Sequence, residues 1–319
     1  MDITVIGCGR WGSFIAKYLC DIGHSVTLYG RESSANMRKL TSERKNAYMA
    51  LPDGVKLTYD IDEALKSGVI AISVGAQGLR SLAKEIAQHG AKNRVFILCM
   101  KGLEIETGDR LSRVMEETVD PSNKIAVWLG PGHVQEFCRG VPNCMVIDSR
   151  DEELKRRLAA EFSSPLIRFY YGNDLIGNEI GAAAKNVVGI AAGILDGLDV
   201  SSLKGSLMSR GTAEISRLIK ALGGSELSAY GLCHLGDYEA TVFSRHSHNR
   251  KFGEMFVKGE RFDKLAEGYY TVKALVLLGE RTGVDLPICS AVYDVLYNGR
   301  DKNDALSSLF SRSTKTEFY

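Results

Sequence analysis

The N-terminal segment is the feature that most restricts the fold. A short apolar run, Ile3–Ile6, leads directly into GCGRWG (7–12), a helical pattern continues to Ile22, and a second apolar run follows at 24–29. G-x-G-x-x-G between a strand and a helix allows a tight turn and brings the backbone close to a pyrophosphate at the helix N-terminus. The motif alone is weak, but in a strand–turn–helix unit of about 30 residues it predicts dinucleotide binding.

The same alternation continues through the first half of the chain. Further short apolar runs lie at 69–74, 95–100, 125–129, 144–147 and 167–171. Helical periodicity separates some of them, at 78–90 and 107–119. Runs of this kind are typical of a parallel sheet that is buried on both faces. The pattern predicts a doubly wound, mostly parallel α/β sheet whose ligands bind beyond the carboxyl ends of the strands.

Strand patterns nearly vanish in the second half. Helices are expected at 174–196, 206–222, 248–257, 271–282 and 287–297. We therefore expect an N-terminal Rossmann domain over residues 1–171, which would bind a dinucleotide, and an all-helical C-terminal domain over residues 172–319.

Lys185 is the unusual residue of the first of these helices. It lies in GAAAKNVVGI (181–190), where its neighbours are too small or too apolar to cover a charge. Helical spacing places it on a face with Asn178, Gly181, Ala182, Gly189 and Ala192. This face permits either tight helix packing, with the lysine reaching solvent, or the approach of a ligand to a lysine of depressed pKa.

The end of the second strand bears on the choice of cofactor. It reads LYGR, where an NAD-specific protein usually presents an acid to the ribose. Gly30 leaves space there and Arg31 can pair with a 2′-phosphate, which favours NADPH somewhat over NADH. The alternative is that Arg31 is a solvated loop charge and Glu32 binds the ribose.

Charge and composition argue against several other classes of protein. The formal net charge is +1, from 40 basic and 39 acidic residues, so nothing points to nucleic acid. No run approaches 18 apolar residues, and strand residues begin at once, so we expect no membrane span, no signal peptide and a cytoplasmic location. The seven cysteines are scattered and the histidines form no metal pattern, so we expect reduced thiols and no metal.

Longer motifs, in order along nearly the whole chain, resemble the soluble bacterial NAD(P)-dependent glycerol-3-phosphate dehydrogenase family. They are GCGRWG (7–12), LYGR (28–31), KGLE (101–104), GPGHVQE (130–136), NDLIGNEIGAAAKNVVGIAAGILDGL (173–198), SRGTAEI (209–215), LGDYEATVFSRHSHNRKFG (235–253) and EGYYTVKAL (267–275). The resemblance implies reduction of dihydroxyacetone phosphate to sn-glycerol 3-phosphate by NAD(P)H, a step toward phospholipids.

The resemblance also implies roles for individual residues. Lys185 would be the proton donor, and Lys101 would polarise the carbonyl as a second catalytic cation. The substrate-binding positions would be Lys101, Gly130, Asn186, Asp237, Ser247, His248 and Asn249. The cofactor-binding positions, with the glycine motif, would be Gly7, Gly9, Arg10, Trp11, Gly12, Arg31, Lys101, Val134, His248 and Glu267.

Three positions depart from the family pattern. His248 stands where an arginine is usual, Gly132 replaces a serine or threonine, and Val134 replaces an alanine. Two alternatives stay open: a reductase of the same fold for another small phosphorylated ketone or keto acid, and an NAD(P)-binding paralogue without catalysis. The small-residue faces of the helical half are also compatible with a homodimer.

Overall fold

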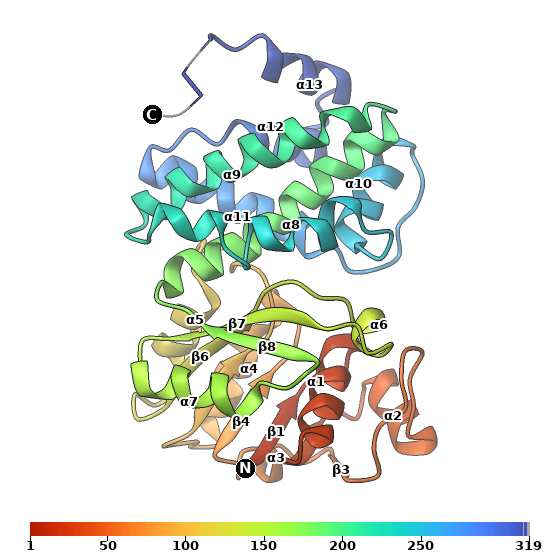
Figure 1. Ribbon diagram of the computed structural model, residues 1–319, viewed down its shortest axis with the longest axis vertical. Helices are drawn as coiled ribbons and strands as arrows, with labels where there is room; N and C mark the ends of the chain where they lie inside the picture. The colour runs from red at the N-terminus through yellow and green to blue at the C-terminus, as the bar shows by residue number, and fades with distance from the viewer. Residues whose placement is uncertain (315, 318–319) are drawn as a thin grey trace.

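The computed structural model describes residues 1–314, 316 and 317, and the chain forms two stacked layers. The lower layer in Figure 1 is a sheet with its helices, and the upper layer is entirely helical. The N-terminus lies at the far end of the sheet layer and the C-terminal segment lies at the far end of the helical layer (Figure 1). This arrangement confirms the predicted fold class.

Eight strands form one sheet. They are β1 (Asp2–Ile6), β2 (Ser25–Tyr29), β3 (Val55–Thr58), β4 (Val69–Ile72), β5 (Val95–Leu98), β6 (Lys124–Leu129), β7 (Asn143–Ser149) and β8 (Ile167–Tyr171). Their order is β3-β2-β1-β4-β5-β6-β7-β8, and every neighbouring pair is parallel except β6–β7. The sheet is therefore mostly parallel, but β7 and β8 run opposite to the rest, which apolar runs alone do not reveal.

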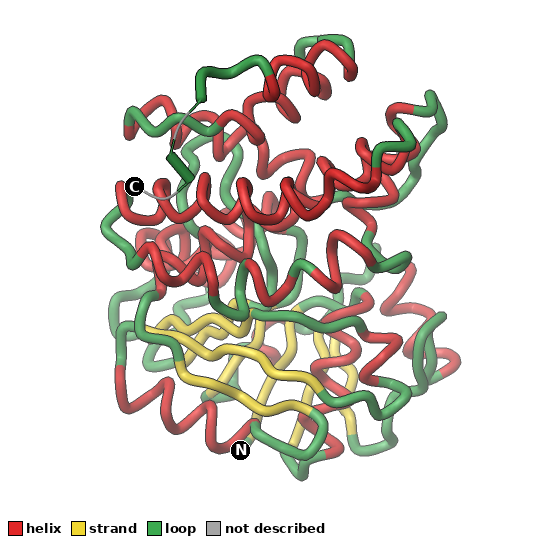
Figure 2. Tube along the Cα trace, turned by 45° about the horizontal axis from the view of Figure 1, so that its top comes forward, coloured by secondary structure: helices red, strands yellow, loops and turns green. Residues whose placement is uncertain are grey.

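Helices cover both faces of the sheet, which appears between them in Figure 2. They are α1 (Arg10–Asp21), α2 (Ala35–Glu43), α3 (Ile61–Ala64), α4 (Leu79–Gln88), α5 (Leu111–Thr118), α6 (Val134–Phe137) and α7 (Glu152–Phe162). The sequence patterns predicted α1, α4 and α5 but not the other four. Two of those, α3 and α6, are single turns too short to produce a hydrophobic period.

The helical layer is built around α8 (Leu175–Gly197). Asp174 caps this helix by accepting a hydrogen bond from the amide of Gly177 at 3.0 Å. The remaining α-helices are α9 (Lys204–Ala221), α10 (His248–Val257), α11 (Glu267–Thr282), α12 (Pro287–Tyr297) and α13 (Lys302–Phe310). The last of these was not predicted.

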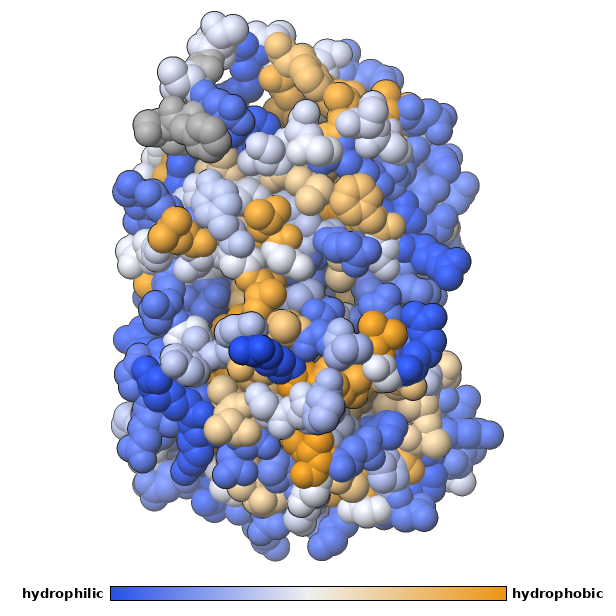
Figure 3. Space-filling view, viewed as in Figure 1, coloured by the Kyte–Doolittle hydropathy of each residue, from blue (hydrophilic) through white to orange (hydrophobic). Residues whose placement is uncertain are grey.

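Among the described residues, α8 alone is long and apolar enough to pass a test for a membrane span, which differs from the expectation that no segment would. However, 89% of its most apolar window is buried inside the protein. In the space-filling view, the surface over the helical layer is mostly hydrophilic or intermediate, with scattered hydrophobic residues (Figure 3). A buried core helix accounts for the apolar composition of α8.

The glycines of α8 allow α10 to pack directly on its backbone. A Cβ on Gly193 would lie 1.9 Å from the carbonyl oxygen of Arg250, and a Cβ on Gly253 would lie 2.2 Å from that of Ile190. Nothing larger than glycine fits at either position while the helices keep this distance. Neither glycine belongs to the predicted small-residue face; on that face Gly189 is the closely packed one, where a Cβ would lie 2.6 Å from Cγ2 of Thr241.

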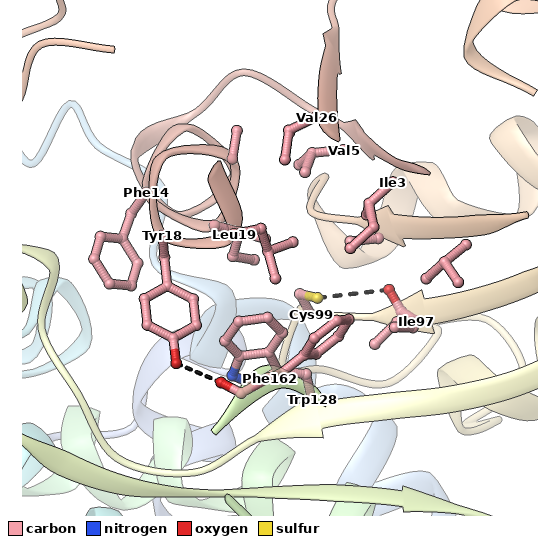
Figure 4. Close-up of a cluster of buried hydrophobic side chains, with 14 of the residues drawn as sticks. Ile3, Val5, Phe14, Tyr18, Leu19, Val26, Ile97, Cys99, Trp128 and Phe162 are labelled. Carbon is pink, nitrogen blue, oxygen red and sulfur yellow. Dashed lines mark hydrogen bonds between the residues drawn. The ribbon is translucent and has the colours of Figure 1, made fainter. Parts of the chain in front are cut away.

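A buried aromatic cluster fixes α1 on the sheet. Trp128 of β6 is 1% exposed and lies beside Tyr18 and Phe162 (Figure 4). The Tyr18 hydroxyl donates to the Phe162 carbonyl at 2.5 Å, which joins α1 to the end of α7. This packing holds the N-terminal end of α1 at the edge of the sheet that faces the helical layer.

Buried carboxylates join the two layers. Glu179 of α8 accepts hydrogen bonds from the amide of Ser112, in the first turn of α5, at 2.9 Å and from Arg110, which precedes α5, at 2.5 Å. Asp148 of β7 accepts a hydrogen bond from the Asn178 side chain of α8 at 2.7 Å. Paired buried charges hold their geometry well because an unpaired partner would be costly. They fix α8 over the sheet and so position the candidate site.

Candidate active site

Three predicted residues from distant parts of the sequence meet where the sheet faces α8. Lys101 follows β5, Lys185 lies on α8, and Asp237 lies in the 3₁₀ turn η4 (Leu235–Asp237). The Asp237 carboxylate accepts from Lys101 Nζ at 2.5 Å and is 3.2 Å from Lys185 Nζ. Asp237 is 1% exposed, so two ammonium groups share one buried carboxylate. We refer to Lys101, Lys185 and Asp237 as the lysine–aspartate cluster.

Lys185 is largely buried rather than extended into solvent; it is 9% exposed. Its Nζ donates a hydrogen bond to Thr241 Oγ1 at 2.8 Å. Burial lowers the pKa of Lys185 to about 8, with Asp237 opposing the shift and the charge of Lys101 adding to it. An ammonium group with this pKa can give and take a proton near neutral pH.

Lys101 connects the cluster to the loop after β6. Its Nζ donates to the carbonyl of Gly130 at 2.6 Å, in addition to its bond with Asp237. The side chain of Lys101 is 21% exposed, so it is more accessible than Lys185. A charge at this position, beyond the carboxyl end of a strand, can interact with a ligand that enters between the layers.

An amide chain continues from the cluster toward α10 and α11. The Asn186 side chain donates to the Lys101 carbonyl at 3.4 Å and accepts from Asn249 Nδ2 at 3.0 Å. Asn249 Oδ1 in turn accepts from the Gly268 amide at 2.9 Å. Ser247, 7% exposed, caps α10 by accepting from the Arg250 amide at 3.3 Å. These bonds align the predicted Asn186 and Asn249 with the lysine–aspartate cluster.

Glu267, at the start of α11, lies against the sheet rather than in solvent. Its Oε1 accepts from the Ala76 amide, just beyond β4, at 3.2 Å. Its Oε2 is buried and lacks a hydrogen-bond partner within the described chain. Burial raises the pKa of this carboxyl. A buried acceptor without a partner is unfavourable unless a ligand donor meets it, so Glu267 fits a cofactor-binding role.

The first turn of α1 fits a pyrophosphate. Gly7 has φ +112°, and a Cβ there would lie 2.2 Å from the Ser73 carbonyl oxygen. Gly9 caps α1 without a side-chain hydrogen bond, so the first amides of the helix are available to an anion. The Trp11 ring packs on Phe14, 5.3 Å between centroids, and the backbone amide of Trp11 is one of these first-turn amides.

Several predicted residues lie away from the lysine–aspartate cluster. Arg31 pairs with Glu85 at 3.0 Å. Arg10 faces the ring of Tyr48, 5.7 Å from its centroid. Val134 is 2% exposed and belongs to the core of the sheet layer. With these partners, none of the three residues takes part in the lysine–aspartate cluster.

His248 is the first residue of α10, and its Nδ1 donates to the Leu265 carbonyl at 3.2 Å. Burial lowers its pKa, so the imidazole is neutral at pH 7. Arg250 does not replace the missing guanidinium, because it binds Asp196 at 2.5 Å and the Ser244 carbonyl at 3.2 Å inside the helical layer.

Gly132, the second departure, has a structural reason. It has φ +149°, and a Cβ there would lie 2.3 Å from Cε2 of Phe137. The ring of Phe137 stacks on Phe14 of α1, with centroids 5.0 Å apart, and is held in that position. A serine or threonine therefore does not fit at residue 132 beside this phenylalanine.

Two site residues were not predicted. Thr241, in the π-helical turn η5 (Glu239–Phe243), accepts the Lys185 hydrogen bond. His133 donates to the Ala240 carbonyl of the same turn at 2.7 Å, and its pKa is lowered to about 4, mainly by burial and partly by Lys185. The sequence motifs GDYEAT and GPGH contain these two residues and could have drawn attention to them. Nothing in the sequence spacing, however, indicates that either residue lies near Lys185.

A separate hollow of about 740 Å³ lies between α9, α12 and α13, and none of the predicted site residues lines it. Within the described residues, no group of three or more His, Cys, Asp or Glu side chains is arranged to hold a metal. The candidate chemistry therefore belongs to the cluster between the two layers.

Comparison with known proteins agrees with this geometry. The family described as NAD-dependent glycerol-3-phosphate dehydrogenase matches with its N-terminal part over residues 2–155 and its C-terminal part over residues 174–307. The glycerol-3-phosphate dehydrogenase [NAD(P)+] of Prosthecochloris aestuarii is 35% identical, covering 99% of this chain and 100% of that protein. The protein of the same description from Streptomyces griseus is 36% identical, covering 98% and 97%.

A solved structure shows the same similarity in three dimensions. The crystal structure of glycerol-3-phosphate dehydrogenase from Coxiella burnetii superposes with a TM-score of 0.91 at 25% identity, over 98% of this chain and 99% of that one. The chain belongs to the NAD(P)-dependent glycerol-3-phosphate dehydrogenase family.

Proposed function

We propose that the protein reduces dihydroxyacetone phosphate to sn-glycerol 3-phosphate with NAD(P)H, using Lys185 as the proton donor. The observation that supports this most directly is the lysine–aspartate cluster at the carboxyl edge of the sheet. A buried lysine with a pKa of about 8 suits a general acid that works near neutral pH. The choice of substrate rests on the 35% identical relative, which is named for this activity.

The chain's residues divide the proton chemistry between them. As hydride reaches the carbonyl carbon, its C=O π electrons move to the oxygen, which takes a proton from the Lys185 ammonium. Lys101 stabilises the charge that develops on that oxygen. Asp237 orients both ammonium groups, and Thr241 holds Lys185 Nζ in place. Neutral Lys185 then regains a proton from solvent, and in the reverse direction it accepts the alcohol proton.

The cofactor site is proposed to extend from the first turn of α1 to Glu267. Bound NAD(P)H supplies the hydride. Free amides after Gly9 can hold its pyrophosphate. Glu267 Oε2, which has no partner among the described residues, can accept a hydrogen bond from a donor group elsewhere on the cofactor. Arg31, beside the ribose position, supports some preference for NADPH. In this proposal, residues 1–171 bind the dinucleotide and residues 172–319 supply most of the substrate site.

The expected cellular context is the cytoplasm, where the product would enter phospholipid synthesis. A homodimer stays a prediction. On α8, Gly189 packs on Thr241, and Gly193 and Gly197 pack on α10, so these three glycines are covered within the chain.

Steady-state oxidation of NADPH and of NADH with dihydroxyacetone phosphate tests the proposed function. We expect turnover of ordinary enzymatic size, at least ~1 s⁻¹, with one or both cofactors. A parallel panel of other phosphorylated ketones and keto acids controls for a changed acceptor. Turnover confined to another compound would contradict the substrate assignment, and binding of cofactor without any turnover would contradict catalysis.

His248→Arg should improve binding of the substrate phosphate. A guanidinium at the N-terminal end of α10 would add a charge-assisted contact that the neutral imidazole lacks, so KM for dihydroxyacetone phosphate should fall about 10-fold. Unphosphorylated dihydroxyacetone is the control, because its kcat/KM should not change. A raised or unchanged KM for the phosphorylated substrate would show that other groups already hold the phosphate.

A further inference from the structure

Arg31 lies two residues beyond the end of β2, beside the dinucleotide turn. Its neighbour Gly30 packs so closely on this turn that a Cβ there would lie 2.8 Å from Cys8 Sγ. In folds of this type, the residue after the second strand meets the ribose 2′ position, which carries a hydroxyl in NAD and a phosphate in NADP. Arg31 is thus placed where the two cofactors differ.

The guanidinium of Arg31 is already engaged by an acid from another part of the sheet layer. Its Nη2 donates to Glu85 Oε2 of α4 at 3.0 Å. The two side chains are 58% and 32% exposed, so solvent reaches the pair. Both charges also act on Tyr29, the last residue of β2, whose pKa is raised first by burial and then by Glu85. Glu85 therefore partly neutralises Arg31 at the 2′ position.

The two cofactors would meet this ion pair differently. A 2′-phosphate that binds Arg31 must displace the Glu85 carboxylate and then stay near its like charge. A 2′-hydroxyl requires neither change. An exposed ion pair is weak enough to be displaced by a phosphate, whose contacts with arginine are stronger. Displacing Glu85 therefore weakens the binding of NADPH and leaves the affinity for NADH nearly unchanged.

From this arrangement we propose that Glu85 is a specificity-determining residue, which lowers the preference for NADPH by holding Arg31 in an ion pair. The inference rests on the proposed use of NAD(P)H and adds a residue that controls the choice between the two forms. Glu85 acts through Arg31 and need not touch the cofactor.

Glu85→Gln tests the proposal, because it removes the charge and keeps the size of the side chain. Dissociation constants for NADPH and NADH are measured by nicotinamide fluorescence, without substrate. We expect Kd for NADPH to fall about 5-fold while Kd for NADH changes less than about 2-fold. The matched control is Glu116→Gln in α5, which removes an ion pair of similar exposure with Arg150 at 3.3 Å, and it should leave both constants unchanged.

The double variant Arg31→Gln/Glu85→Gln shows whether Glu85 affects cofactor binding through Arg31. If Glu85 acts through Arg31, the Kd ratio for the two cofactors should be the same in the double variant as in Arg31→Gln alone. An unchanged ratio in Glu85→Gln, or a change that persists without Arg31, would overturn the inference. Wild-type protein that binds neither cofactor would instead overturn the proposed function, so the two failures are distinguishable.

Discussion

Lys185→Met should lower kcat for dihydroxyacetone phosphate reduction by roughly 10²-fold or more, because general acid catalysis typically contributes that much. Methionine keeps the length and apolar stem of lysine, so it suits the buried position on α8. The cofactor contacts proposed here lie on other elements, so NADPH affinity should stay near the wild-type value. Steady-state kinetics and a fluorescence titration measure the two effects separately.

Lys204→Met is a matched control for this variant. Lys204 is also a buried lysine of the helical layer, and its partner Asp196 keeps a second ion pair with Arg250. Its loss should change thermal stability more than kcat. A Lys185→Met protein with wild-type kcat would remove Lys185 from the mechanism, whatever its effect on stability.

Asp237→Asn should move the pH dependence of the reaction. Reduction needs protonated Lys185, so in the wild type the rate should be highest below pH 8 and fall as the pH rises through the pKa of about 8. Asp237 raises this pKa and Lys101 lowers it. Without the carboxylate, the pKa of Lys185 is lower, and the fall should occur at lower pH. At pH 8, kcat for reduction should decrease by roughly 10-fold or more.

Rate profiles from about pH 6 to about pH 9.5, in both directions, measure this shift. Oxidation of glycerol 3-phosphate needs neutral Lys185, so the rate of oxidation should begin to rise at a lower pH in the variant than in the wild type. A variant that was only poorly folded would lose activity by the same factor at every pH. Unchanged midpoints in both directions would show that Asp237 does not set the protonation of Lys185.

Local features of this chain were predictable from sequence because their causes are local. The glycine motif between β1 and α1 and the apolar strands each depend on neighbouring residues, and the structure places them as expected. β3 escaped prediction because VKLT contains only two apolar residues. The reversed direction of β7 depends on a pairing with β6 that no local pattern encodes.

The site was predictable as a set of residue types but not as a geometry. The resemblance indicated Lys101, Lys185 and Asp237 together, yet the sharing of one carboxylate by two ammonium groups arises only when β5, α8 and η4 meet. The same holds for Glu85, which reaches Arg31 from a helix 54 positions further along the chain. These ion pairs join residues that are far apart in the sequence, so sequence spacing could not predict them.

The contact between Gly132 and Phe137 constrains how this loop can change during evolution. A side chain at residue 132 would collide with the aromatic ring, and the left-handed backbone there already favours glycine. Acquiring the family's serine or threonine therefore requires a smaller residue at 137 first, whereas the reverse order passes through a strained intermediate. The two sites are epistatic, and the effect of a substitution at one of them cannot be transferred between relatives without knowing the residue at the other.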